Sequence, residues 1–161
     1  MRQLKNEQIK KRIYIDMDNV LVDFKSGIDK LDENMINKYE GRLDEVPNIF
    51  SIMDLYPNAK ESVHILSDKY DLYILSTAPW LNPSAWAHKI EWVHKYFGKE
   101  KESLFYKKLI ISHHKNLNVG DYLIDDRPNN GAKDFKGEWI HFGSQDFPDW
   151  NVITRYLLSK V

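Results

Sequence analysis

Two carboxylates separated by one residue follow an apolar run near the start of the chain, in Ile-Tyr-Ile-Asp16-Met-Asp18. A short apolar run of this kind is typical of a buried strand, and at its end the backbone can turn both side chains toward one ligand. Two acids packed together repel each other, and one pKa rises unless a cation is near. Taken alone, the pair fits a solvated acidic turn equally well.

A second pair of carboxylates, Asp125 and Asp126, follows another apolar run at 122–124. Ligands of parallel α/β sheets bind at the carboxyl ends of the strands, near the point where strand order reverses. If the two runs are neighbouring strands, Asp16, Asp18 and Asp125 converge there. Oxygen ligands suit Mg²⁺, which is commonly bound by one or two carboxylates together with a substrate phosphate. The two pairs together therefore favour a magnesium site for a phosphate ester.

A hydroxyl and a lysine complete a candidate phosphate site. Thr77 ends a third apolar run and can donate a hydrogen bond to a phosphate oxygen. Lys115 lies in a polar loop after a further run and can supply the positive charge that a transferring phosphoryl group needs. Each residue is common when taken singly, so their order along the chain is what supports the site. The chain has no cysteine, which excludes a thiolate nucleophile and a Cys-ligated metal.

Five short apolar runs predict the strands that position these residues, at 13–15, 72–75, 109–111, 122–124 and 139–142. Helical periodicity lies at 59–70, 83–97 and 149–158. In the first two helices the residues expected to face the core are Val63, Ile65, Leu66, Trp86, Ile90, Val93 and Phe97. Strands that alternate with helices indicate right-handed crossovers and a parallel sheet. The expected fold is α/β, a Rossmann-like three-layer sandwich with a five-stranded parallel sheet.

Residues 27–56 do not fit the alternation, because this polar stretch is longer than the roughly dozen residues that one crossover needs. We predict a small helical cap at 27–56, inserted after the first strand of a core domain formed by 1–26 and 57–161.

The order Asp16-x-Asp18, Thr77, Lys115 and Asp125-Asp126 resembles the four-motif layout of the haloacid dehalogenase (HAD) superfamily. Four segments also resemble the 5′(3′)-deoxyribonucleotidase family: Asp-Met-Asp-Asn-Val-Leu-Val-Asp-Phe, Ser-Thr-Ala-Pro, Trp-Val-His-Lys-Tyr-Phe-Gly and Leu-Ile-Asp-Asp-Arg-Pro. The resemblance spans nearly the whole chain beyond Lys11. It implies a Mg²⁺-dependent phosphomonoesterase that hydrolyses (deoxy)nucleoside monophosphates through an aspartyl-phosphate.

The resemblance also implies catalytic and metal-binding roles. Asp16 would attack phosphorus, and Asp18 would protonate the leaving oxygen and then deprotonate the water that releases phosphate. Mg²⁺ would be held by the Asp16 carboxylate, the Asp18 backbone carbonyl and Asp125. Asp126 would act through a water or from outside the first shell of ligands.

Five positions would bind the substrate: Asn19, Phe24, Thr77, Ala78 and Lys115. The backbone N–H of Asn19 would join Thr77 and Lys115 around the phosphoryl group, and Phe24 would line the base pocket. Ala78 stands where relatives have Ser, and Asn19 stands where they usually have Gly. The cap lacks the Trp of the Phe-Trp pair found in the animal enzymes.

Other aromatic and histidine residues allow simpler interpretations. Trp80 follows the phosphate loop closely, so stacking on a base and simple packing are both open for it. We interpret Trp86 as helix core, and His113 and His114 as a solvated loop pair.

The formal net charge is −1, from 23 Lys+Arg and 24 Asp+Glu. This balance argues against a nucleic acid polymer or a membrane as partner, since both attract clustered Lys and Arg. The polar opening segment predicts no secretory signal, so we expect a cytoplasmic protein that acts on a small-molecule phosphate ester. A homodimer stays open. So do two alternatives: a phosphatase for another small phosphomonoester, and a catalytically inactive phosphate-binding relative.

Overall fold

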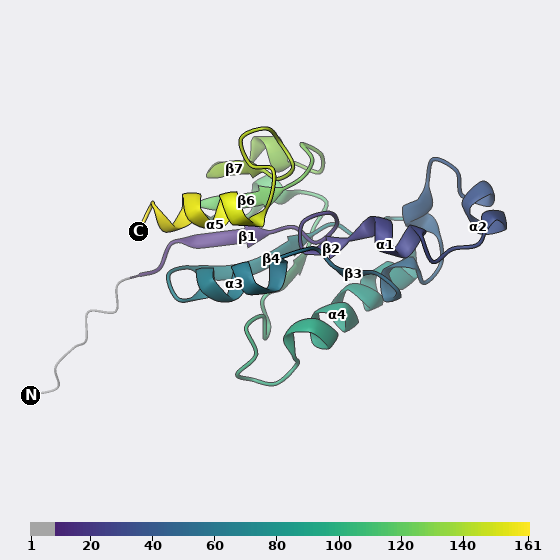
Figure 1. Ribbon diagram of the computed structural model, residues 1–161, viewed down its shortest axis with the longest axis horizontal. Helices are drawn as coiled ribbons and strands as arrows, with labels where there is room; N and C mark the ends of the chain where they lie inside the picture. Colours follow the sequence, from purple (N-terminus) through teal and green to yellow (C-terminus); the bar gives the residue numbers. More distant parts are fainter. Residues whose placement is uncertain (1–8) are drawn as a thin grey trace, which may run out of the picture.

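A computed structural model describes residues 9–161 as a parallel sheet with a helical segment projecting beyond one end of it (Figure 1). The sheet order is β5-β4-β1-β6-β7. The strands are β1 (Arg12–Ile15), β4 (Asp71–Ser76), β5 (Leu109–Ile111), β6 (Tyr122–Asp125) and β7 (Glu138–His141). The expected α/β fold with a five-stranded parallel sheet is confirmed, and each predicted strand end agrees to within one residue.

The strand order reverses at β1, which pairs with β4 on one side and with β6 on the other. Ile15 lies opposite Ile124 of β6, and the next residue, Asp16, donates its backbone N–H to Ile124 O at 2.9 Å. The carboxyl ends of β1 and β6 are therefore adjacent. Residues that follow these two strands meet at the edge of the sheet where α/β proteins bind ligands.

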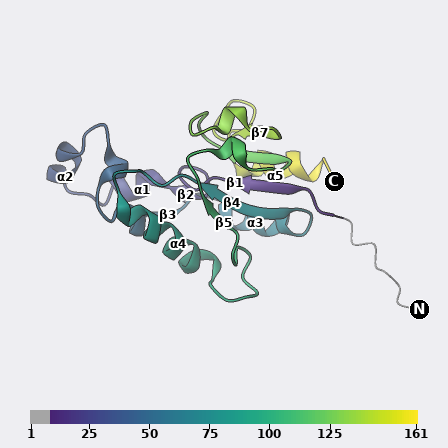
Figure 2. The same cartoon turned by 180° about the vertical axis from the view of Figure 1, so that it is seen from behind.

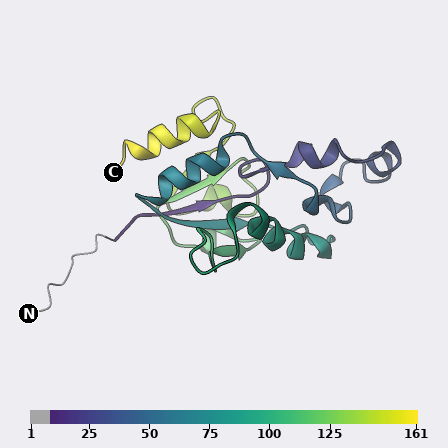
Figure 3. The same cartoon turned by 60° about the horizontal axis from the view of Figure 1, so that its bottom comes forward.

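One face of the sheet is covered by α3 (Ala59–Ser67), α4 (Pro83–Phe97) and α5 (Trp150–Leu158). Figure 3 shows α3 and α5 side by side, and buried residues of α4 join the same core. The strand residues in this core include Ile13, Ile15, Leu72, Ile74 and Ile140, which are at most 1% exposed. Each such side chain contributes roughly 1.5–3 kcal/mol of burial free energy, which fixes β1 firmly under the site.

The other face carries Tyr14, Leu75 and Leu123, which pack with Ala132 and Phe135. Its covering elements are two short 3-10 helices, η3 (Lys115–Leu117) and η4 (Ala132–Asp134). Figure 2 shows the molecule from behind, with β1, β4 and β5 in front of α3 and α5. The layer on this face is thinner because only short, polar connections follow β5 and β6.

The helical segment after β1 lies between two short antiparallel strands, β2 (Val22–Asp23) and β3 (Asp54–Leu55). It contains α1 (Phe24–Ile28), α2 (Glu33–Lys38), η1 (Leu43–Glu45) and η2 (Ile49–Ser51). We call residues 24–53 the insert. The insert projects past the carboxyl ends of the core strands (Figure 1). The division of the chain into a cap of residues 27–56 and a separate core domain stays a prediction.

Three residues expected in the core are exposed: Ile65 is 48%, Trp86 39% and Ile90 36% exposed. In α4 the buried stripe begins one residue earlier, at Ala85 and Lys89. Two neighbouring stripes of this helix have nearly the same spacing, and the larger apolar side chains favoured the wrong one. A lysine on the buried stripe is the reason that apolarity alone misleads there.

We predict no secretory signal in the polar opening segment. Residues 1–8 of this segment lie outside the described residues. Within residues 9–161 no helix has the length and apolarity needed to cross a bilayer. The 15-residue helix α4 is shorter than the roughly 20 residues that such a span requires.

Candidate active site

Asp16 lies directly after β1 and is only 5% exposed. Its Oδ1 is 2.9 Å from the Nζ of Lys115, which is itself buried. The same ammonium group hydrogen-bonds Asp125 Oδ2. Lys115 is held in place by its own backbone N–H, which donates to Asn130 O at 2.8 Å. Asp16 and Lys115, both predicted site residues, therefore form an ion pair at the carboxyl end of the sheet.

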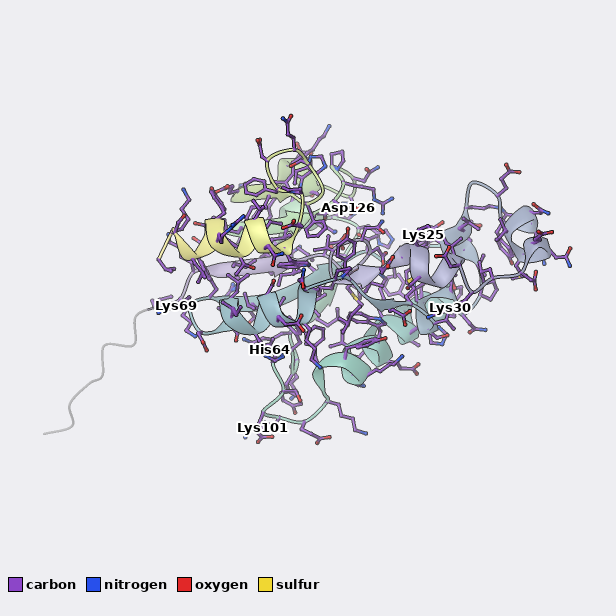
Figure 4. All side chains as sticks on the ribbon, in the orientation of Figure 1. Lys25, Lys30, His64, Lys69, Lys101 and Asp126 are labelled. Carbon is purple, nitrogen blue, oxygen red and sulfur yellow. The ribbon has the colours of Figure 1, made fainter. Side chains whose placement is uncertain are left out.

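Three carboxylates form a cluster at this point. Asp16, Asp125 and Asp126 each offer one oxygen, and these atoms lie within 4.8 Å of one another. Asp126 Oδ1 is buried and has no hydrogen-bond partner among the described residues, whereas its Oδ2 accepts from Asn19 Nδ2 at 3.3 Å. In Figure 4 Asp126 lies where the end of the sheet meets the insert. An unpartnered buried carboxylate oxygen beside two further carboxylates is a donor set that fits Mg²⁺.

Burial and neighbouring charges shift the pKa values of the ionisable groups in this cluster. Burial and the negative charge of Asp16 raise the pKa of Asp125 to about 7, against the lowering effect of Lys115. The same two causes raise the pKa of Asp126. Burial acts to lower the pKa of Lys115, but the charges of Asp16 and Asp125 outweigh it and raise that pKa. The residual repulsion is what a bound cation would relieve.

The side chain of Asp18 lies apart from this cluster and contacts Lys89 of α4. The Lys89 Nζ is 3.0 Å from Asp18 Oδ2 and 3.1 Å from Oδ1. Burial raises the pKa of Asp18, while the positive charge of Lys89 opposes that rise. Lys89 is absent from the predicted site. It lies four residues after Ala85 and four before Val93, both of which are buried, and so belongs to the buried stripe of α4.

The loop that carries Asp18 is a tight turn. The backbone N–H groups of Val20, Leu21 and Val22 all donate to Met17 O. Asn19 has φ 60°, a left-handed conformation that Gly adopts freely and Asn tolerates better than most residues. This conformation explains how Asn can stand where relatives usually have Gly.

The expected contact between the Asn19 backbone N–H and a phosphoryl group stays a prediction, and it would require this N–H to give up or share its present acceptor. That N–H donates to Val22 O at 2.8 Å, because the turn uses it to close on itself. The Asn19 residue still lines the pocket described next.

A pocket of about 430 Å³ opens above the cluster, within the usual range of roughly 300–1,000 Å³ for small-molecule sites. The insert contributes Phe24, Leu43 and Asp44 to its wall. The core contributes Asp18, Asn19, Thr77, Ala78, Pro79, Trp80, His113, Arg127, Asn129 and Asn130. A smaller recess is lined by Asp16, Asp18, Thr77, Lys115, Asp125, Arg127, Asn129 and Asn130. Asp18, Thr77, Arg127, Asn129 and Asn130 line both, so the pocket and the recess are continuous.

Four predicted substrate positions, Asn19, Phe24, Thr77 and Ala78, line the pocket, and Lys115 lines the recess. Thr77 Oγ1 donates to Ser112 O at 2.7 Å, so its hydroxyl must change acceptor to bind a phosphate. Phe24 packs edge-on against Phe50 of the insert, with ring centroids 5.9 Å apart.

The loop aromatics differ in part from expectation. Trp80 is 77% exposed on the pocket wall, where a flat ligand can reach it. Trp86 is exposed, so its assignment to the helix core is wrong. Both rings pack against His113, at 5.8 and 5.9 Å. His113 is therefore partly buried rather than solvated, whereas His114 is exposed as predicted.

Residues 39–151 match the family of the 5′ nucleotidase, deoxy (pyrimidine), cytosolic type C protein (NT5C). The chain belongs to this family. It is 55% identical, over 92% of this chain and 85% of the relative, to a protein of Vibrio phage KVP40 assigned as a 5′(3′)-deoxyribonucleotidase. A Staphylococcus epidermidis protein with the same assignment is 32% identical over 83% of each chain. The human mitochondrial 5′(3′)-deoxyribonucleotidase is 25% identical over 81% of this chain and 68% of that protein.

Solved structures extend the relation to the superfamily fold. A haloacid dehalogenase-like family hydrolase from Xanthomonas campestris aligns with a TM-score of 0.52 at 11% identity, over 94% of this chain and 96% of that one. A haloacid dehalogenase-like hydrolase from Streptococcus pneumoniae also reaches 0.52, at 16% identity over 91% and 90%. The resemblance of the sequence motifs to the deoxyribonucleotidases is confirmed by the family match, and the two structures show that the chain shares the fold of haloacid dehalogenase-like hydrolases.

Proposed function

We propose that this chain is a Mg²⁺-dependent 5′(3′)-deoxyribonucleotidase, which hydrolyses (deoxy)nucleoside monophosphates through an aspartyl-phosphate on Asp16. One observation carries the proposal: the buried Asp16–Lys115 ion pair lies at the foot of a pocket whose walls hold aromatic side chains. The family relation supports it, because the relatives named above are assigned this activity. We further propose a cytoplasmic location, with small phosphate esters rather than nucleic acid polymers as partners.

Asp16 is the nucleophile in this proposal. Its carboxylate oxygen forms a bond to phosphorus while the ester P–O bond breaks, which divides one difficult hydrolysis into two easier steps. Lys115, 2.9 Å away, holds the carboxylate in one orientation and places positive charge beside the developing phosphoryl charge.

Asp18 moves the protons. In the first step its carboxylic acid gives a proton to the leaving nucleoside oxygen. In the second step the resulting carboxylate takes a proton from the water that attacks phosphorus, which releases inorganic phosphate and restores Asp16. A carboxyl group whose pKa is raised by burial suits the first role, since it keeps a proton nearer to neutral pH.

The metal would be held by the carboxylates of Asp16, Asp125 and Asp126, together with the Asp18 backbone carbonyl. The support is the unpartnered Oδ1 of Asp126 and the close approach of the three carboxylates. When bound, Mg²⁺ supplies positive charge to the phosphoryl oxygens and to the crowded carboxylates.

The nucleoside would occupy the wider part of the pocket. Phe24 from the insert and Trp80 from the core offer aromatic surfaces to a base from different elements. Ala78 has no hydroxyl, so Thr77 would be the hydroxyl donor that this loop gives to the phosphate.

The test is release of inorganic phosphate from deoxyuridine and thymidine monophosphates by the full chain with Mg²⁺. We expect turnover by the wild type and a loss of at least about a thousandfold in Asp16→Asn. Turnover that survives Asp16→Asn would exclude the covalent mechanism. Preference for another small phosphomonoester in a substrate screen would support the proposed phosphatase mechanism but identify a different substrate. Absence of turnover on every ester, combined with failure to bind beryllium fluoride alongside Mg²⁺, would indicate a catalytically inactive relative that acts as a binding module.

A further inference from the structure

Lys89 is a fully buried ammonium group that the proposed reaction does not yet use. Its side chain is 0% exposed, and it reaches the site from the middle of α4. A buried charge costs several kcal/mol of desolvation unless it is paired and hydrogen-bonded. The Lys89 Nζ is paired with both oxygens of Asp18 and is 3.1 Å from Ser76 Oγ.

The contacts of Lys89 fix one orientation of the Asp18 carboxylate. The distances to the two oxygens, 3.0 and 3.1 Å, are nearly equal, so rotation of the carboxylate would break at least one contact. Lys115 forms the corresponding ion pair with Asp16, through Asp16 Oδ1. The two catalytic aspartates are therefore each held by a lysine of their own, and neither lysine contacts both.

Lys89 also touches the insert. Its Nζ lies 4.4 Å from the centroid of the Phe50 ring, within the range of a cation–π contact. Phe50 in turn packs edge-on against Phe24, which lines the pocket. A continuous set of contacts thus joins the Asp18 carboxylate to the aromatic wall of the substrate pocket.

We propose that Lys89 is a positioning residue for the proton-transfer step, holding the Asp18 carboxylate toward the leaving oxygen and bracing it against Phe50 of the insert. This inference rests on the proposed function, since it needs Asp18 to be the acid–base group. It differs from a purely structural ion pair in one measurable respect. A positioning role affects substrates according to how much their leaving group needs a proton, whereas a structural role affects all substrates equally.

The experiment compares two leaving groups in the full chain with Mg²⁺. Thymidine monophosphate expels an alkoxide, which needs a proton, and p-nitrophenyl phosphate expels a stable phenolate, which needs little protonation. We expect Lys89→Met to lower kcat/KM for the nucleotide by about a hundredfold or more, with KM changed less than threefold. The two substrates are compared in kcat/KM because this ratio covers the steps up to transfer of the phosphoryl group to Asp16, whereas hydrolysis of the aspartyl-phosphate is the same for both. The loss for p-nitrophenyl phosphate should be at least tenfold smaller. Lys89→Arg should recover part of the nucleotide rate, and Lys95→Met on the exposed side of α4 is the matched control.

A double variant guards against a folding failure, because Asp18→Asn with Lys89→Met leaves neither charge unpaired. We expect Lys89→Met to cause less than a threefold further loss in the Asp18→Asn background, since its effect passes through Asp18. Equal losses on the two substrates, or full additivity in the double variant, would overturn the inference. Asp16→Asn is assayed in parallel to separate the two proposals. If Asp16→Asn stays active, the proposed function is contradicted. If Asp16→Asn is inactive but Lys89→Met has normal activity, only the inference about Lys89 is contradicted.

Discussion

The carboxylates at the carboxyl ends of β1 and β6 are neutralised to different extents by nearby cations. Lys115 contacts Asp16 and Asp125, but the nearest cation to Asp126 is the Arg127 guanidinium at 3.9 Å, on a side chain that is 61% exposed. An exposed pair at that distance contributes little. Asp126 is therefore the least neutralised of the three carboxylates, and the Oδ1 that faces Arg127 has no hydrogen-bond partner among the described residues. This asymmetry is the physical reason to expect a cation there rather than elsewhere in the pocket.

The raised pKa of Asp125 makes the stability of the metal-free protein depend on pH. Burial and repulsion by Asp16 raise this pKa from 3.8 to about 7 in the folded protein. Between these values the folded chain binds more protons than the unfolded chain, so stability falls as pH rises from about 4 to about 7. We expect the melting temperature measured in EDTA to decline over this range by more in the wild type than in Asp125→Asn.

Added Mg²⁺ should reverse that trend, because it binds the deprotonated carboxylates. The gain in melting temperature on adding Mg²⁺ should be larger at pH about 8 than at about 5. A gain independent of pH, or a wild-type EDTA profile identical to that of Asp125→Asn, would contradict the assignment of Asp125 to the cation site.

At the scale of elements, α5 supports the turn that follows β1 and carries Asp18. Trp150 is fully buried at the start of α5, and its Nε1–H donates to Val20 O at 2.8 Å. We expect Trp150→Phe to lower the free energy of unfolding by about 1–3 kcal/mol, because the Val20 carbonyl is left buried without a partner. Urea denaturation measures this loss. The matched control is Trp80→Phe, whose exposed ring should change stability by no more than about 0.5 kcal/mol. Equal effects of the two substitutions would exclude the supporting role.

The sequence predicted the strands well for a definite reason. Each core strand is short and almost continuously apolar, and its ends are marked by polar residues, so its limits could be read to within one residue. The clustering of Asp16 with Asp125 followed from the same reasoning, since parallel strands place their carboxyl ends at one edge. The metal-binding and catalytic roles of these residues stay predictions.

Lys89 and the phase of α4 could not be predicted in the same way. A lysine is normally assigned to solvent, and its burial here depends on Asp18, which is 71 residues earlier in the chain. The pairing becomes visible only when the turn after β1 and the helix after β4 are placed in space. The prediction of which face of α4 is buried was wrong for the same reason, since the buried stripe of this helix includes that one charged residue.

At the scale of the whole molecule, α4 fastens the insert to the core. Trp92 Nε1 donates to Met53 O at 3.1 Å, and Asn82 Nδ2 donates to Asp44 O at 2.8 Å. Lys30, labelled in Figure 4, ties the start of the insert to its end, since its Nζ donates to Ile52 O at 2.6 Å and to Asp54 Oδ2 at 2.8 Å. The wall of the pocket formed by Phe24 and Leu43 is thus held in a defined position above the carboxylates, although it belongs to a segment that projects from the sheet.

Under the proposed function, a base would be bound by residues of two parts of the molecule, Phe24 of the insert and Trp80 of the core, both of which line the pocket. Stacking of one base on an aromatic ring contributes about 1–3 kcal/mol, equivalent to roughly 5–150-fold in affinity. We expect Phe24→Leu and Trp80→Ala each to raise KM for thymidine monophosphate by a factor in this range, with kcat changed little. Leu keeps most of the apolar volume at Phe24, and Trp80 is exposed, so neither change should unfold the chain. The same variants should leave KM for glycerol phosphate unchanged, because that ester has no ring to stack. If KM rises equally for both esters, the aromatic wall shapes the phosphate site rather than binding a base, and the preference for nucleotides must then arise elsewhere in the pocket.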